Sequence, residues 1–511
     1  MRRFLPLFVL LLGLLQPRSV SAQVQCGVVH SLDFPVDPTR FRVMQDYGAQ
    51  SYRHQGRYHT GEDWYGGDGV GEYVRAIAAG RVTFSSANGW GRDGGVIIIE
   101  HTFPDSSVAY SMYGHITDQT GVQFPAVYSC VQQGDVLAAV GDARPTPHVH
   151  LEIRTTNPDI PGAGYTWNYP ADEGLRRPSK FILNWQTWLT DAYRWRLDLA
   201  DETGAVAPPV PLADNGLLAL DSNRVIRVSA DGRLLWRVNL STVAVGLLPA
   251  SGDGAYIAYA DGHFERVNND STVGETWELG IALAGAPLIL ADRILFPTPN
   301  GIAALDSAAR SVLWAQTDLG AVARWQVAGD QIGVITTANA MITLTTAGTI
   351  LDEARLREPG ALAADSGGLL AYTRGGAWRI DAAGAWTPLI ENTPAGGAES
   401  AVASDGRVFL WDGASLYGYN AEHFGLWQLP LPGVDGTAQL EIFDRALLLT
   451  TSHGDLIAIQ PESGGVCNRT RIYGDNFTQM WHALGADGIL RVHLADQIIG
   501  LDWEEFLLGC A

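Results

Sequence analysis

The chain has 511 residues, too many for a single hydrophobic core, so we expect two or three domains. Its hydrophobic content of 46% and charged content of 17% exclude an intrinsically disordered chain. A formal net charge of −21 argues against nucleic acid and other acidic polymers as partners, because like charges repel.

Residues 1–22 have the pattern of an export signal. Arg2 and Arg3 provide the positive start, residues 4–15 an apolar run, and residues 20–22 the small side chains that precede a cleavage point. A run of about 12 apolar residues is too short to span a bilayer, which favours removal over the alternative of an uncleaved anchor. We therefore expect a secreted or extracytoplasmic, cell-envelope associated protein without a transmembrane segment after signal removal.

The cysteines are distributed as two early and two late residues. An oxidising compartment favours their pairing. Cys26 and Cys130 precede the middle of the chain, whereas Cys467 and Cys510 lie near its end. The simplest assignment is one disulfide in each half, although spacing alone leaves the connectivity open.

The first predicted domain, residues 24–185, is β-rich. Short apolar runs such as 95–100 and 108–113 alternate with clusters of Gly, Asp and Pro, and no long helical periodicity interrupts them. This pattern predicts an all-β domain.

Two motifs in this domain bring together residue types that bind metal ions. His59 and Asp63 form an H-x-x-x-D motif, and Gly61 between them lets the chain turn so that both side chains converge. His148 and His150 form an H-x-H motif, and residues two apart on a strand share one face.

A third element is His115, at the end of the predicted strand 108–115. Two histidines, one carboxylate and a vacant fourth position make an open zinc site, the type used for hydrolysis. Two further histidines could then accept and donate the protons that hydrolysis requires.

The order of these motifs resembles that of the lysostaphin-type (LytM-like) zinc peptidases. The family patterns H-x-x-x-D, Tyr-(Gly/Ala)-His and H-x-H-(Leu/Phe)-Glu correspond to residues 59–63, 113–115 and 148–152, and the resemblance extends over residues 42–155. It implies an antiparallel β domain of the duplicated hybrid motif type with the metal in a groove between loops.

The same resemblance implies the roles of individual residues. His59, Asp63 and His150 would bind Zn²⁺, and His115 and His148 would be the catalytic histidines. The usual substrates of the family are peptide bonds in the stems or cross-bridges of peptidoglycan.

From residue 190 to 511 the sequence changes to a repeat. Tryptophans at positions 195, 236, 277 and 314 are spaced by 41, 41 and 37 residues, and the series continues at 386 and 427 after a degenerate unit near Ile350. A period near 40 residues built from short strands predicts a β-propeller, with seven or eight blades. We expect the tryptophans to pack between neighbouring blades.

Three further expectations concern the repeat and the segment before it. Residues 301–314 resemble the repeat of quinoprotein-like (PQQ-like) propellers, and residues 181–186 would join the two domains. Cys467 and Cys510 would occupy equivalent positions in the last two units, where a disulfide would staple the closing blades.

The leading functional hypothesis is an active zinc metalloendopeptidase that cleaves peptidoglycan or an envelope peptide. Its propeller would serve targeting or bind an unknown ligand, possibly a protein. One alternative is a non-catalytic protein that binds the cell envelope or activates a hydrolase, although the retained motif residues argue against it. A propeller-based quinone oxidoreductase is a second alternative, and the lack of a repeated acidic metal site or adjacent cysteine pair disfavours it.

Overall fold

The computed structural model describes residues 26–510, except positions 68, 92–93, 120, 144–145, 200–203, 222, 251–252, 291, 307–309, 358–359, 366–367, 374–375, 392–398, 403–404, 435–436, 473–479 and 495. The export signal predicted at 1–22 lies outside these residues and stays a prediction. The chain divides into two compact units, Met1–Pro178 and Ser179–Ala511. Within the described residues, no helix combines the length and apolar character needed to cross a bilayer.

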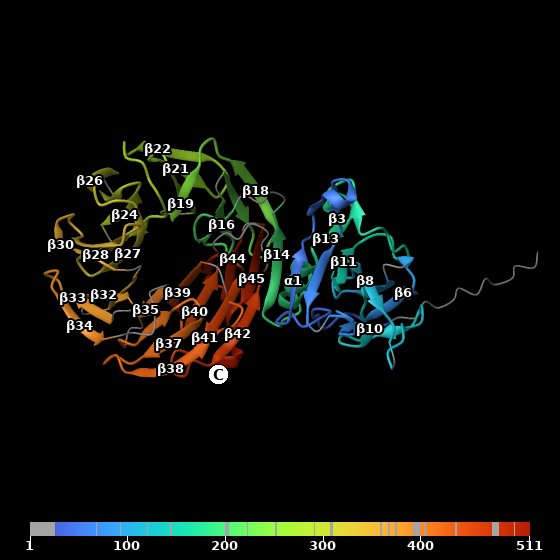
Figure 1. The fold of residues 1–511 in the computed structure, drawn as a ribbon. Coiled ribbons are helices and arrows are strands. Elements are labelled where there is room, and N and C mark those ends of the chain that lie inside the picture. Colours follow the sequence, from blue (N-terminus) through green and yellow to red (C-terminus); the bar gives the residue numbers. More distant parts are fainter. Residues whose placement is uncertain are drawn as a thin grey trace, which may run out of the picture. The chain divides into compact units, whose positions relative to one another are not determined.

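The first unit is almost entirely β-structure (blue to cyan in Figure 1). A ten-stranded sheet has the order β1-β4-β11-β8-β7-β6-β9, with β10 joined to β5 and β8, and β13 joined to β11; a second sheet has the order β12-β3-β2. The strands are β1 (Phe41–Gln45), β2 (Gln50–Ser51), β3 (Arg57–His59), β4 (Glu62–Gly66), β5 (Tyr73–Arg75), β6 (Gly80–Ser86), β7 (Gly95–Thr102), β8 (Val108–Thr117), β9 (Cys130–Val131), β10 (Val136–Val140), β11 (Val149–Arg154), β12 (Tyr165–Thr166) and β13 (Leu175–Arg176). Two 3₁₀ turns, η1 (Tyr52–His54) and η3 (Pro170–Glu173), complete it.

The core of this unit follows from the apolar runs. Strand β7 carries four consecutive residues, 96–99, that are fully buried, so both of its faces are covered. Its partner β8 has an alternating start and a buried centre, and the two strands pair from Gly95 to Thr102. This double-sided burial places β8 and its neighbour β11 rigidly in the middle of the sheet.

The second unit consists of helix α1 (Pro178–Trp188) and eight four-stranded antiparallel sheets in the described residues. The first four sheets contain β15 (Val210–Pro211), β16 (Leu217–Asp221), β17 (Arg224–Val228), β18 (Leu234–Asn239); β19 (Ala244–Pro249), β20 (Gly254–Tyr259), β21 (His263–Asn268), β22 (Val273–Glu278); β23 (Leu288–Ile289), β24 (Arg293–Thr298), β25 (Gly301–Asp306), β26 (Ser311–Gln316); β27 (Val322–Ala328), β28 (Gln331–Thr336), β29 (Ala340–Thr345) and β30 (Ile350–Arg355).

The next three sheets contain β31 (Ala361–Asp365), β32 (Gly368–Thr373), β33 (Gly376–Ile380), β34 (Trp386–Glu391); β35 (Glu399–Val402), β36 (Val408–Trp411), β37 (Ser415–Tyr419), β38 (Gly425–Pro430); β39 (Ala438–Phe443), β40 (Ala446–Thr451), β41 (Asp455–Ile459) and β42 (Val466–Arg471). The eighth contains β14 (Tyr193–Asp198), β45 (Gln497–Asp502), β44 (Ile489–His493) and β43 (Trp481–Leu484). Figure 1 shows the sheets as the blades of a ring. The predicted all-β propeller is confirmed, with eight blades.

The eighth blade closes the ring with strands from both ends of the repeat region. Strand β14 comes first in the chain and pairs with β45, which comes last. This register lets the two ends of the propeller hold each other, the usual requirement of a closed ring. Segment 181–186, expected to connect the domains, lies within helix α1.

Repeat tryptophans pack between neighbouring blades, as predicted, and three of them are hydrogen-bonded to the following blade. The indole Nε1 groups of Trp236, Trp314 and Trp427 donate hydrogen bonds to backbone carbonyls of the following blade, at 2.7, 3.0 and 3.1 Å. Gly348 lies against the Trp314 indole with a φ of +87°, and a Cβ there would come within 2.5 Å of the ring. Such a turn needs glycine for its conformation and for the close approach.

Both disulfides are formed as the simplest assignment predicted, Cys26 with Cys130 and Cys467 with Cys510. The expected position of Cys510 is wrong, however. The outer strand of the closing blade is β14, which carries Trp195, whereas Cys510 lies in the short turn η4 (Leu508–Cys510) beyond the last strand. Of the seven or eight blades expected, the described residues form eight, because β14 from the start of the repeat region completes the last blade.

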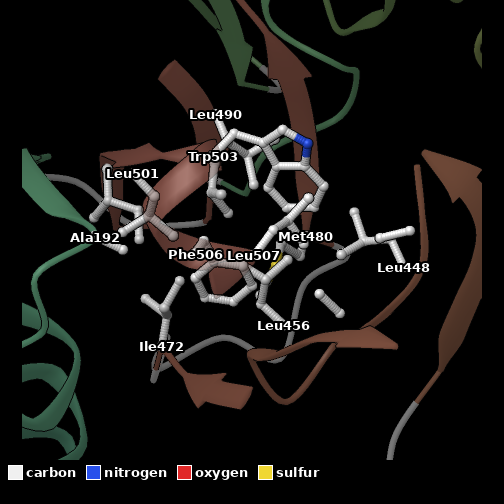
Figure 2. Packing of buried hydrophobic residues seen from close by; sticks show 14 of the residues in the cluster. Ala192, Leu448, Leu456, Ile472, Met480, Leu490, Leu501, Trp503, Phe506 and Leu507 are labelled. Carbon is white, nitrogen blue, oxygen red and sulfur yellow. The ribbon is translucent and has the colours of Figure 1, made fainter. Parts of the chain in front are cut away.

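The turn η4 follows the short helix α2 (Trp503–Phe506), which covers the end of the closing blade. Figure 2 shows Trp503, Phe506 and Leu507 packed over Leu456, Ile472, Met480 and Leu490. Burial of two aromatic side chains here contributes several kcal/mol of hydrophobic stabilisation. The disulfide from Cys510 to Cys467 on β42 fastens this cap to the preceding blade.

Candidate functional site

The candidate ligands lie on neighbouring strands at the centre of the ten-stranded sheet. Strand β11 runs between β4 and β8. In this register His150 stands directly opposite Asp63 of β4 and opposite Gly114 of β8. Because directly paired residues of antiparallel strands point to the same face, the His150 and Asp63 side chains meet.

His59, at the end of β3, joins these two residues. The His59 Nε2 atom lies 3.0 Å from His150 Nδ1 and 3.2 Å from Asp63 Oδ1, and His150 Nδ1 lies 2.9 Å from the same carboxylate oxygen. All three side chains are buried. Among the described residues this is the one group of histidine, cysteine and acidic side chains close enough to hold a metal ion.

Gly61 permits the approach, but for a reason that the sequence did not show. Its backbone does not adopt a left-handed conformation. A Cβ at this position would lie 2.1 Å from the Leu151 carbonyl oxygen and 2.9 Å from His150 Nε2. The glycine therefore allows close packing of β4 on β11 and not an unusual turn.

Contacts outside the cluster orient both imidazole rings. His59 Nδ1 donates to the Asp46 carbonyl at 3.2 Å, so its Nε2 atom faces the cluster. His150 Nε2 faces the Glu152 carboxylate at 3.5 Å, so its Nδ1 atom faces the cluster. Two ring nitrogens and a carboxylate oxygen thus converge on one point, where either a proton or a metal cation can be held between them.

The spacing of the three donor atoms fits a zinc ion. Tetrahedral zinc with bonds of about 2.0–2.1 Å places neighbouring ligand atoms about 3.3 Å apart. The observed separations of 2.9–3.2 Å are close to this value. The donor set of two imidazoles and one carboxylate is likewise typical of an open zinc site.

Charge interactions support the same arrangement. Burial opposes ionisation of Asp63, but hydrogen bonds from His150 and His59 outweigh it and hold the pKa of this carboxyl well below its usual range. Burial also opposes protonation of His150, yet Asp63 and Glu152 raise its pKa to about 9. Both shifts show that the site favours positive charge between its carboxylates.

A buried relay supports His150 from behind. Glu152 forms an ion pair with Arg154, and both side chains are buried. Arg154 donates to the carbonyls of Asn157 and Ile160, at 3.3 and 2.6 Å. The relay therefore connects a candidate ligand to the loop that precedes residues 162–164 of the cleft wall. Sequence reasoning gave neither residue a role, although Glu152 stood in the quoted motif.

His148 lies beside the cluster without joining it. Its Nδ1 donates to the Thr146 carbonyl at 2.8 Å, so the lone pair of the neutral ring is on Nε2, which lies 3.6 Å from Asp63 Oδ2. The ring stacks on Tyr65 with a centroid distance of 4.5 Å. Burial lowers the pKa of His148 and so favours the neutral form.

His115 reaches the cleft from a β-bulge in β8. Gly95 pairs with Ile116 and Val96 with Gly114, so His115 is the extra residue, with a φ of +58°. Left-handed backbone is rare for a residue with a Cβ, and bulges of this kind redirect a side chain next to functional sites. Its ring lies 4.5 Å from that of His148 between centroids.

All five predicted residues line one cleft with a volume of about 450 Å³. Trp90 and His54 line it as well, as do Tyr65, Tyr165 and Arg53, which sequence reasoning missed. Two other aromatic residues of the motif region, Trp64 and Tyr113, are buried in the core.

Two family models match the chain, one within each of its two compact units. Residues 57–161 match Peptidase family M23, and residues 189–318 match a family described as outer membrane protein assembly factor BamB. No curated protein matches the chain.

Three of the solved structures similar to this chain share 11–15% identity with it. BamB from Moraxella catarrhalis has 15% identity and a TM-score of 0.44, covering 61% of this chain and 99% of that one. The computationally designed Ika8 protein has 11% identity and a TM-score of 0.48, covering 60% and 98%. Sqt1 from Saccharomyces cerevisiae has 11% identity and a TM-score of 0.47, covering 61% and 99%.

Proposed function

We propose that this protein is an exported zinc metalloendopeptidase that hydrolyses peptide bonds of peptidoglycan, with the propeller targeting it to the cell envelope or to a partner. The observation that carries the proposal is the convergence of His59, Asp63 and His150 on one point at the base of a cleft. The match of residues 57–161 to Peptidase family M23 supports it.

His59, Asp63 and His150 would hold the metal ion. Zn²⁺ would supply a Lewis acid for the scissile carbonyl and lower the pKa of a bound water, which is the chemistry that amide hydrolysis needs. The second carboxylate oxygen of Asp63 lies 3.6 Å from His148 Nε2, so the proposed metal ligand and the proposed catalytic histidine are direct neighbours.

The two remaining histidines would manage the protons. His148 presents the unprotonated Nε2 to the cleft, where it accepts the proton of the attacking water. His115, half-buried and 4.5 Å from His148 between ring centroids, would stabilise the negative charge that develops on the carbonyl oxygen. A neutral His148 is needed for this step, and its lowered pKa supports that state.

Export and envelope association rest on other observations. The N-terminal pattern of residues 1–22 and the formation of both disulfides support an oxidising, extracytoplasmic location. The acidic net charge of −21 disfavours nucleic acid as a ligand of either unit.

The test is zinc content together with cleavage of purified peptidoglycan, measured for the wild type and for His59→Ala. We expect one zinc per wild-type chain and release of wall peptides by the wild type alone. His30→Ala provides the control, because His30 is exposed and does not line the cleft. Absence of zinc, or zinc without cleavage of peptidoglycan, would contradict the proposal and favour a non-catalytic envelope-binding protein.

A further inference from the structure

The charges of the cleft differ from those of the rest of the protein. The chain carries a net charge of −21, yet among the described residues the cleft is lined by one carboxylate, Asp63, and one arginine, Arg53, besides its histidines. Asp63 is a proposed metal ligand, so a bound divalent ion would more than neutralise it. With that ion bound, the described lining would carry a net positive charge, and Arg53 is its permanently charged side chain.

The turn that carries Arg53 is held firmly in place. Arg53 is the middle residue of η1 (Tyr52–His54). His54 stacks on Tyr165 with 3.7 Å between ring centroids, Ser51 Oγ lies 2.9 Å from His54 Nδ1, and Arg57 donates to the His54 carbonyl at 3.2 Å. These contacts position the backbone of Arg53 at the edge of the cleft before any ligand arrives.

The guanidinium itself makes no hydrogen bond or ion pair with the residues that the structure describes. Three other exposed or half-buried arginines of this unit form ion pairs: Arg40 with Glu72, Arg81 with Glu100 and Arg177 with Asp46. Arg53 is exposed and lines the cleft. Its charge is therefore available to a ligand that enters the cleft.

We propose that Arg53 forms a carboxylate-binding subsite that selects peptides carrying a free carboxylate close to the scissile bond. The inference rests on the proposed peptidase function and specifies its substrate class. A guanidinium binds a carboxylate with two parallel hydrogen bonds, which lysine cannot reproduce. The carboxylate could be the C-terminal group of a peptide or the side chain of an acidic residue, since both present the same two oxygens.

Binding measurements test this subsite without depending on turnover. Three fluorescein-labelled peptides serve as probes: Ala-Ala-Ala-Ala with a free C-terminus, Ala-Ala-Glu-Ala with an amidated C-terminus, and Ala-Ala-Gln-Ala with an amidated C-terminus. Dissociation constants are measured by fluorescence anisotropy with zinc-loaded full-length protein carrying His115→Ala, alone and combined with Arg53→Gln, Arg53→Lys or Arg75→Gln. Arg75 is the matched control, because it is exposed on β5 and does not line the cleft.

We expect at least one carboxylate peptide to bind about 10-fold tighter than the neutral peptide, the gain of one charge-assisted contact near a surface. The preference should disappear with Arg53→Gln, fall with Arg53→Lys and persist with Arg75→Gln. Preference for the first or second probe identifies the source of the carboxylate. Equal binding of all three peptides, no binding of any, or a preference that survives Arg53→Gln would overturn the subsite.

These outcomes are separate from those of the proposed function. Loss of the carboxylate preference concerns Arg53 alone, and a wild type that still releases wall peptides would remain a peptidase. Conversely, a carboxylate preference in a protein that cleaves no peptidoglycan would keep the subsite and refute the hydrolysis.

Discussion

Both units bury charged side chains, but they do so in different ways. In the propeller, buried charges are paired locally: Arg491 with Asp487 at 2.7 Å, Asp455 with Arg471 at 2.8 Å, and Arg227 with Asp214. Each pair belongs to one blade, so the charges are spread around the ring. The first unit also has such a pair, Glu152 with Arg154, but three buried histidines at the centre of its sheet converge on Asp63.

This difference separates structural from functional burial of charge. A paired Arg and Asp satisfy each other and leave nothing for a ligand. The histidine cluster instead brings two ring nitrogens and a carboxylate oxygen within 2.9–3.2 Å of one another, an arrangement that a bound cation can satisfy. Buried ionisable groups therefore indicate a binding site where their neighbours leave room for a ligand, and a structural role where they form ion pairs with one another. The following experiments test this distinction between the two units.

The largest effect is expected from His150→Ala. It removes the ligand opposite Asp63, so zinc should be lost and hydrolysis should fall below detection, by more than about 10⁴-fold. Calorimetry should show an unchanged unfolding transition for the propeller. Zinc retained at one ion per chain in this variant would show that the cluster is not the metal site.

His115→Ala should separate binding from catalysis. His115 belongs to the cleft but not to the converging cluster, so the zinc content should stay at the wild-type level. The rate should fall about 10²- to 10⁴-fold, the usual contribution of a proton-transfer or charge-stabilising group. Activity equal to that of the wild type would remove His115 from the mechanism.

The disulfides allow the stability of the two units to be changed one at a time. The pairs Cys26–Cys130 and Cys467–Cys510 close segments with sequence separations of 104 and 43 residues. On chain-entropy grounds, replacing either pair by serine costs about 4–5 kcal/mol. Denaturant unfolding should show that each double variant shifts the transition of its own unit only; a shift of both transitions would mean that the units unfold together.

Glu152→Gln tests the relay behind His150. The change keeps the shape of the side chain but removes the charge that faces His150 and Arg154. Loss of such an outer partner typically weakens metal binding 10- to 100-fold. Competition with a zinc chelator measures the affinity, and an unchanged dissociation constant would assign Glu152 to folding alone.

The smallest expected effect is on the pH dependence of stability, through one buried histidine in each unit. Burial lowers the pKa of His101 and of His493 to about 4, below the value near 6.5 of an unfolded chain. The unfolded state therefore binds more protons between pH 6.5 and 4, so each unit should lose stability as the pH falls through this range, by at most about 2 kcal/mol per histidine at pH 5.

Replacement by leucine should distinguish the two histidines. His101 hydrogen-bonds the Ala79 carbonyl at 2.8 Å and the Ser111 hydroxyl at 2.7 Å, so His101→Leu should cost about 1–3 kcal/mol at pH 7. His493 has no partner for either ring nitrogen among the described residues, so His493→Leu should be nearly neutral there. Both variants should lose part of the pH dependence, and unfolding curves at pH 5 and 7 would detect it.

Much of the architecture could be predicted because it repeats or lies in local patterns. The regular tryptophans predicted blades, and the structure confirms that Trp236 and Trp314 staple neighbouring ones. Cys510 was misplaced because a linear repeat does not show that β14 from the start of the region completes the final blade. Ring closure is a long-range pairing, which spacing along the chain cannot reveal.

For the site, the sequence by itself determined which residues are the candidates for the chemistry: His59, Asp63, His115, His148 and His150 are recognisable from motif order and from the alternation of side chains on a strand. Only the tertiary structure decided how they are placed relative to one another. The pairing of β11 with β4 sets His150 against Asp63, and the bulge in β8 turns His115 into the cleft. Arg53 and Glu152 gained their places from contacts between segments distant in sequence, because side-chain convergence depends on strand register and burial and not on local spacing.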